Sequence, residues 1–155
     1  MKLEELFTYQ VQISKPIKVG RSPKGIRTLF QITGGSVDGP ALNGKVIPYL
    51  GGEFQQIGDD GRLQLDVRMG IETDDGVTIY VTYQGLFECF DDVIEIMRNN
   101  DGACQFGDAY FVNQLRFESG HEKYAWLNNI VCVAEGRMAN SKTIEYRVYK
   151  CVPSS

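Results

Sequence analysis

The sequence has few of the residues that build metal centres and nucleophile sites. His121 is its only histidine, and its four cysteines, at positions 89, 104, 132 and 151, form no C-x-x-C pair. Because a zinc site needs four sulfur or nitrogen ligands at short spacing, we predict no metal site. The cysteines are interpreted as scattered structural or surface thiols in reduced form. No serine or cysteine is placed to form a recognisable triad with His121, so we do not assign catalysis to it.

Long apolar runs and basic runs are also missing. Stretches such as Ile130–Ala134 are far too short to cross a bilayer, and the first residues, MKLEELFTYQVQIS, lack the apolar core of a signal peptide. We therefore predict a cytoplasmic protein without a membrane partner. The net charge of −4 and the absence of an RNA-binding signature argue against nucleic acid as a partner. A nucleic-acid-binding open barrel is kept only as an alternative.

The stretch Leu63 to Gly85, LQLDVRMGIETDDGVTIYVTYQG, carries the clearest pattern in the chain. Apolar and polar residues alternate on both sides of Asp74-Asp75-Gly76, which predicts two strands and a tight turn. A two-residue turn would pair apolar with polar residues. A three-residue turn with Gly76 in the left-handed conformation pairs like with like, so we predict that register. It joins Ile71 with Ile79, Met69 with Val81, Val67 with Tyr83, Glu72 with Thr78, Arg68 with Thr82 and Asp66 with Gln84.

The rest of the chain reads as short strands between glycine-rich turns. Lys15–Gly25 contains two prolines and two glycines and is predicted to be a loop. One helix is predicted at about Asp91–Asn99, capped by Asp91 or Asp92. The other predicted strands are Leu3–Ser14, Ile26–Thr33, Ser36–Gly39, Lys45–Pro48, Glu53–Ile57, Asp108–Glu118, Tyr124–Gly136 and Thr143–Val152.

This spacing of strands and turns predicts an all-β fold. A chain of 155 residues is the size of one domain, so we expect a single barrel domain over residues 1–155. Regular short strands fit a sandwich or a barrel, and we favour an antiparallel barrel of about nine or ten strands because closure removes exposed edges. The pairs Gly34-Gly35 and Gly51-Gly52 do not open a helix, so they are read as turns rather than phosphate cradles, and no cofactor is predicted.

Several motifs in order give the chain a family resemblance. They are Thr33-Gly34-Gly35-Ser36-Val37 with Gly39-Pro40, Asp66-x-Arg68, Glu72-Thr73-Asp74-Asp75-Gly76 with Ile79-Tyr80-Val81, Phe117-Glu118-Ser119-Gly120, and Tyr124-Ala125-Trp126-Leu127-Asn128. Over nearly its whole length the chain resembles the bacterial family called domain of unknown function 3237, also uncharacterised protein family 0311. The resemblance implies a lipocalin-like β-barrel with no established activity. Where that family usually has Asp-Trp after Gly51-Gly52, this chain has Glu53-Phe54, so the ligand or the polarity of a pocket there would differ.

Two segments are candidates for a small-molecule site. One face of the Leu63–Gly85 hairpin carries Asp66, Arg68, Glu72, Tyr80 and Gln84. If it lines the barrel, the arginine and carboxylates could orient a ligand and Glu72 could accept a proton. The alternative is a solvated outer face. In the second segment Trp126 shares a predicted strand face with Tyr124 and Asn128 and could form a pocket wall, or simply fill the core. The predicted ligand-binding residues are Asp66, Arg68, Glu72, Tyr80, Tyr110, Glu118, Trp126 and Asn128.

The sequence therefore predicts a protein of unknown function that binds an unidentified small molecule in a polar pocket at the barrel interior or mouth. The alternatives are a cofactor-independent acid–base enzyme, such as an isomerase, and a non-catalytic oligomeric scaffold. Whether it is an enzyme is left open. A homodimer is expected, because the apolar stripes exceed what one short helix can cover.

Overall fold

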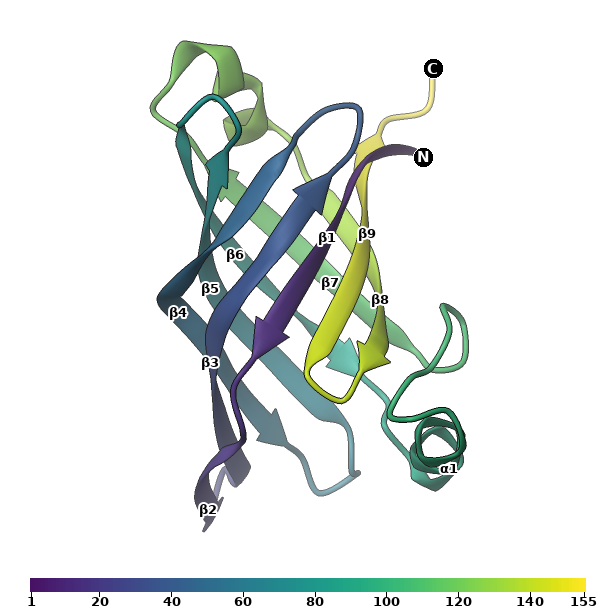
Figure 1. Cartoon of the computed structure of the whole chain (residues 1–155). Helices are drawn as coiled ribbons and strands as arrows, with labels where there is room; N and C mark the ends of the chain where they lie inside the picture. Colours follow the sequence, from purple (N-terminus) through teal and green to yellow (C-terminus); the bar gives the residue numbers. More distant parts are fainter.

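A computed structural model describes residues 1–155, and its strands close into a barrel (Figure 1). The antiparallel order β1-β9-β8-β7-β6-β5-β4-β3 is completed by pairing of β3 with β1, which gives eight barrel strands. The ninth strand, β2, extends along β3 where β1 has ended. The elements are β1 Lys2–Ile13, β2 Ile17–Ser22, β3 Gly25–Asp38, β4 Gly44–Ile57, β5 Leu63–Thr73, β6 Thr78–Phe87, α1 Asp91–Asn99, β7 Phe111–Glu118, the 3₁₀ helix η1 Glu122–Asn129, β8 Cys132–Asn140 and β9 Thr143–Val152.

The β5–β6 hairpin has the register that like-with-like pairing predicted. All six predicted pairs are cross-strand partners, from Asp66 opposite Gln84 to Glu72 opposite Thr78. The turn is closed by hydrogen bonds between Thr73 and Val77, and Gly76 has a φ of 85°. The apolar side of the hairpin faces into the barrel and the polar side faces out.

Four segments differ from the sequence prediction. The strands predicted at Lys45–Pro48 and Glu53–Ile57 are one strand, β4, because an irregularity between Val46 and Gly51 accommodates Pro48, while Gly51 and Gly52, predicted as a turn, pair with Met69 and Arg68 of β5. Ile26–Thr33 and Ser36–Gly39 likewise merge into β3, with an irregularity between Gln31 and Ser36. Part of the predicted Lys15–Gly25 loop is β2. The predicted Tyr124–Gly136 strand is the helix η1 followed by β8.

The predicted helix is correct in its bounds and wrong in its cap. Helix α1 spans Asp91–Asn99, but its N-cap residue is Phe90, and no side chain caps it. Val93 is buried, and Ile96 and Met97 pack against the core beside one end of the barrel. Helix η1 lies at the other end, where the Tyr124 hydroxyl donates to Asp75 of the β5–β6 turn at 2.6 Å (Figure 1).

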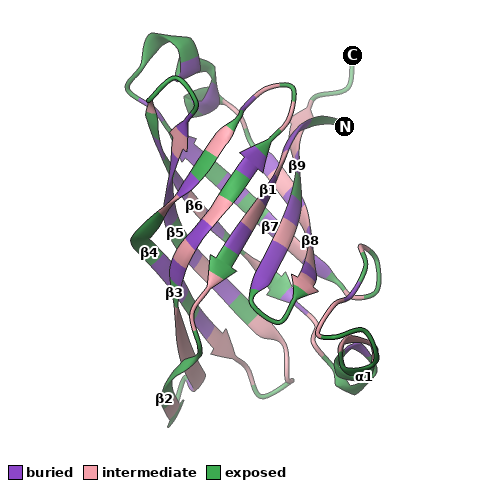
Figure 2. Ribbon diagram, viewed as in Figure 1, coloured by how far each residue is buried: buried purple, intermediate pink, exposed green.

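Burial alternates along most of the barrel strands, because successive side chains point to opposite faces, with exposed runs only at residues 2–5 of β1 and residues 48–51 of β4 (Figure 2). The 29 buried apolar residues form one cluster inside the barrel. These apolar stripes pack against one another across the interior, so the helix does not have to cover them. A homodimer was expected because the apolar stripes exceed what one helix can cover, and that argument no longer applies. The oligomeric state stays a prediction.

Two inward-facing glycines give neighbouring side chains room to cross the barrel. A Cβ on Gly136 would meet ring atoms of Phe111 and Tyr146 at 2.7–2.8 Å, and one on Gly85 would meet the Asn113 Oδ1 atom at 2.1 Å. Both contacts are far inside van der Waals distance. The interior arrangement of Phe111, Asn113 and Tyr146 therefore depends on these two glycines.

We expect Gly136→Ala to destabilise the protein by about 1–3 kcal/mol, because the added methyl group overpacks the aromatic core. Gly120→Ala is the matched control, since a Cβ there meets nothing within 4 Å. It should change the free energy of unfolding by less than about 0.5 kcal/mol. Urea denaturation measures both, and equal stability of the two variants would contradict the packing described here.

Candidate functional site

The polar face of the β5–β6 hairpin lies on the outside of the barrel. Asp66 is half-buried and Arg68 is exposed, and no ion pair joins them. Glu72 pairs instead with Lys45 of β4 at 3.3 Å, and Tyr80 is 43% exposed. The arrangement in which this face lines the interior is therefore wrong, and the solvated alternative describes its position.

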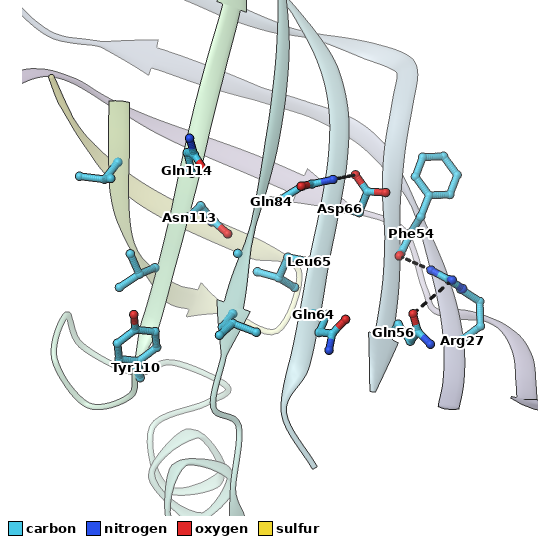
Figure 3. Close-up of a pocket in the computed structure, with 14 residues that line it drawn as sticks. Arg27, Phe54, Gln56, Gln64, Leu65, Asp66, Gln84, Tyr110, Asn113 and Gln114 are labelled. Carbon is cyan, nitrogen blue, oxygen red and sulfur yellow. Dashed lines mark hydrogen bonds between the residues drawn. The ribbon is translucent and has the colours of Figure 1, made fainter. Parts of the chain in front are cut away.

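Two shallow depressions nevertheless lie on this outer wall, with volumes of about 580 and 470 Å³. Asp66 borders both, Tyr110 borders the larger, and Arg68 and Tyr80 border the smaller. In the larger one, Gln84 Nε2 donates to Asp66 Oδ1 at 3.5 Å, and Arg27 donates to the Phe54 carbonyl at 2.8 Å (Figure 3). The structure thus brings four of the predicted site residues to one wall, where their role in binding stays a prediction.

The other four predicted residues do not join them, and one of these is Glu72, which is paired with Lys45. Glu118 is exposed on the outer face of β7, and Trp126 is 37% exposed on η1. Asn128 is used structurally: its side chain accepts from the Ser119 N–H and donates to the Ser119 carbonyl, both at 2.8 Å. The shared strand face predicted for Trp126 and Asn128 is wrong, because this segment is a 3₁₀ helix.

A second cavity, of about 210 Å³, lies inside the barrel toward the end that carries α1. All eight barrel strands contribute to its wall, so it is enclosed by the fold as a whole. Ser141, an exposed residue in the β8–β9 turn, also lines it and marks the mouth at that end. The polar wall residues on β4 are Glu53 and Gln55, and the apolar ones are Ile13, Phe30, Leu63, Leu65, Phe87, Phe111, Met138 and Ile144.

Glu53 is the residue in this cavity with the most unusual environment. Its side chain points inward from β4, it is only 5% exposed, and its Oε1 atom has no hydrogen-bond partner. Burial raises its pKa from 4.5 to about 8, and the negative charge of Asp66 adds to that rise. The carboxyl group is therefore mostly protonated at neutral pH, and it can both give and take a proton in that range.

A layer of aromatic and amide side chains is sealed beside Glu53. Tyr9 stacks on Tyr146 with ring centroids 4.9 Å apart, and Tyr83 meets Tyr146 edge-on at 5.5 Å. Burial raises the pKa of all three phenols, and the charge of Glu53 raises each further. No hydrogen bond of good geometry reaches the Tyr9 and Tyr146 hydroxyls or the Asn113 amide. The three phenols and Asn113 nevertheless lie close enough to shift one another's pKa values through side-chain hydrogen bonding. A buried polar cluster with poorly satisfied hydrogen bonds is uncommon in a folded protein and often marks a functional site.

Sequence reasoning missed this cluster because β4 inverts the usual pattern. In the segment Glu53–Ile57 the polar side chains of Glu53 and Gln55 point inward, while Phe54 points out and borders the outer depression. Polar residues in an alternating strand normally face water, so the pattern favoured the opposite orientation. One signal was available, namely the family departure at Glu53-Phe54.

Comparisons with known proteins agree with the fold. The model of a family described as "Protein of unknown function (DUF3237)" matches residues 1–151. A UPF0311 protein of Clostridium acetobutylicum is 35% identical in an alignment of 138 positions that covers 86% of this chain and 85% of that protein. The crystal structure of a conserved protein of unknown function from Rhodopseudomonas palustris superposes with a TM-score of 0.85 at 29% identity, covering 98% of this chain and 99% of that one.

One similar protein carries an activity in its name. The "Hydroalkoxylation enzyme phnH" of Penicillium herquei is 29% identical over 147 residues, which are 95% of this chain and 80% of that protein.

The buried carboxyl group predicts a specific dependence of stability on pH. Between pH 4.5 and about 8 folded Glu53 keeps a proton that the unfolded chain releases, so the wild-type protein loses stability as pH rises through this window. In Glu53→Gln this loss disappears. Urea denaturation should show the variant gaining roughly 3–5 kcal/mol relative to wild type between about pH 4.5 and pH 9, at about 1.4 kcal/mol for each pKa unit. Parallel pH profiles of the two proteins would show that Glu53 titrates normally.

Proposed function

Because this chain belongs to the DUF3237 family of proteins of unknown function, we propose its function from its own geometry: it binds a small molecule inside the barrel, against Glu53. The observation that carries the proposal is a carboxyl group that lines an enclosed cavity and has no counter-charge. Burying a carboxyl group without a hydrogen-bond partner is costly even when it is protonated. A bound molecule that hydrogen-bonds to Glu53 would offset that cost.

The cavity also has the usual chemistry of a small-molecule site. Its wall is mainly apolar and aromatic, with two polar side chains on one strand, and that combination is the common one for ligand pockets. The stacked rings of Phe87 and Phe111, 4.1 Å apart, form one flat wall. The other walls come from rigid strands, so the pocket is preformed.

A second candidate function is acid–base catalysis without a redox partner. Glu53 favours it, because a carboxyl group with a pKa of about 8 can move protons at neutral pH. The name of the Penicillium herquei relative supports the same chemistry. In a hydroalkoxylation, an O–H bond and a C=C π bond are replaced by C–O and C–H bonds, so no electrons enter or leave. Protonated Glu53 would supply the proton to carbon and then recover one from the hydroxyl group.

A cytoplasmic location, an unidentified small-molecule partner and a homodimer are kept in the proposal as predictions from the sequence. The assignment of the cavity does not depend on the location or on the oligomeric state.

Blocking the mouth of the cavity tests the binding function. We expect wild-type protein to retain members of a mixed set of single-ring aromatic compounds, neutral, acidic and basic, in mass spectrometry under nondenaturing conditions. Ser141→Trp should abolish this, because residue 141 lines the mouth, whereas Lys142→Trp, one residue further along the same turn, should not. If Asp66→Asn abolishes binding and Ser141→Trp does not, the ligand site is the outer wall instead.

The enzymatic candidate has its own test. We choose ortho-hydroxyphenyl propenyl ketone, a single-ring molecule whose hydroxyl group can close onto its own C=C bond to give a methylchromanone. Wild-type protein should accelerate closure and favour one enantiomer, and Glu53→Gln should slow the catalysed rate by about 10²–10⁴-fold. Glu122→Gln, which neutralises an exposed carboxyl group at the far end of the barrel, is the control. A racemic product formed at the buffer rate would leave binding as the function.

A further inference from the structure

The buried interior of the barrel contains no positively charged side chain. Glu53 is the only charged side chain among the buried residues of the protein. The remaining polar wall groups of the cavity, on Gln55 and Ser141, are neutral. No lysine, arginine or histidine lines it, so an entering anion would find no cation there.

The sealed layer beside Glu53 does not supply a counter-charge either. Tyr9, Tyr83 and Tyr146 present neutral phenols, because burial holds their pKa values well above the usual range. Asn113 adds a neutral amide. These neutral groups can form hydrogen bonds, but such bonds do not offset the hydration free energy that a carboxylate loses on entering an apolar cavity.

A cation fits the cavity less well than a neutral molecule. At neutral pH the Glu53 carboxyl group is mostly protonated, since burial raises its pKa to about 8. It then presents one O–H donor and one carbonyl acceptor, which match a hydroxyl group without any change of charge. An ammonium ion would lose its own hydration and would also require Glu53 to ionise, and buried ion pairs often fail to recover that cost.

The size of the cavity limits the ligand further. Its volume, about 210 Å³, is below the range of about 300–1,000 Å³ that holds drug-sized ligands. The walls include Leu63 and Leu65 on β5, the strand beside Glu53, and the stacked pair Phe87 and Phe111, with Phe87 paired to Leu63 across the β5–β6 ladder. One ring of carbon atoms suits this space.

The cavity is lined by one carboxyl group and by no cationic side chain. We therefore propose that its ligands are uncharged molecules the size of a single ring that bring a hydroxyl group to Glu53, and that carboxylates of the same shape are excluded. This inference rests on the proposed function and names the class of molecule that the site takes. It concerns binding, so it holds for both a carrier and an enzyme.

Three probes of one shape and different charge test it: benzyl alcohol, benzoate and benzylamine. In ligand-observed NMR titrations of the wild-type protein at about pH 7, benzyl alcohol should bind at least tenfold more tightly than benzoate or benzylamine. A tenfold ratio of Kd values corresponds to about 1.4 kcal/mol of binding free energy. Ser141→Trp should remove its binding. Glu53→Gln should keep most of it, because an amide still offers one donor and one acceptor.

A cation placed at the mouth provides a gain-of-function test. Ser141→Arg should raise the affinity for benzoate by about tenfold or more, because a guanidinium group pairs well with a carboxylate. Lys142→Arg is the matched control, since residue 142 does not line the cavity, and it should leave benzoate binding unchanged.

Each outcome decides between the two proposals. Binding that is blocked by Ser141→Trp but is equal for the three probes, or stronger for benzoate or benzylamine, overturns the inference and leaves the proposed function standing. If none of the probes binds and the mixed compound set also gives no complex, the proposed function fails and the inference fails with it.

Discussion

Pairing of β1 with β3 is the contact on which the interior depends. It closes the sheet, so side chains that alternate along eight strands are divided between a sealed inside and a wet outside. In an open sheet, an inward glutamate could turn its carboxyl group to water at an edge. In the closed barrel Glu53 has no such route, and its raised pKa, the buried tyrosine hydroxyls around it and the cavity that it lines are consequences of the same enclosure.

The energetic arrangement inside the barrel combines a large apolar core with a small unsatisfied polar cluster. Twenty-nine buried apolar residues stabilise the fold, and this reserve allows the molecule to tolerate several buried polar atoms without partners. Those atoms come from β1, β4, β7 and β9, strands that are far apart in the sequence. Buried polar groups without hydrogen-bond partners are common where a protein binds a ligand or a substrate.

Some of this could be predicted from the sequence and some could not. The hairpin register followed from local rules, because a shift of one residue would have set Ile79 opposite Glu72 rather than Ile71. Local rules did not determine whether the polar face of this hairpin points into or out of the barrel, because alternation alone does not say which side of a strand is enclosed. Bulges hid the continuity of β3 and β4, and Tyr124 to Asn128 has a spacing that a strand and a 3₁₀ turn can both satisfy. Glu53 faces inward against the pattern of its own strand, and only contacts between distant strands determine that.

The enclosure of the cavity by all eight barrel strands has a kinetic consequence. Strands in a closed barrel cannot separate without breaking ladder hydrogen bonds on both sides, so no single strand can move aside to admit a molecule. A ligand bound there would have to enter past the end near the β8–β9 turn, so motions of that turn would limit its association rate. The association rate would then respond to residues around Ser141, whereas contacts at Glu53 would act on the dissociation rate and so on the affinity.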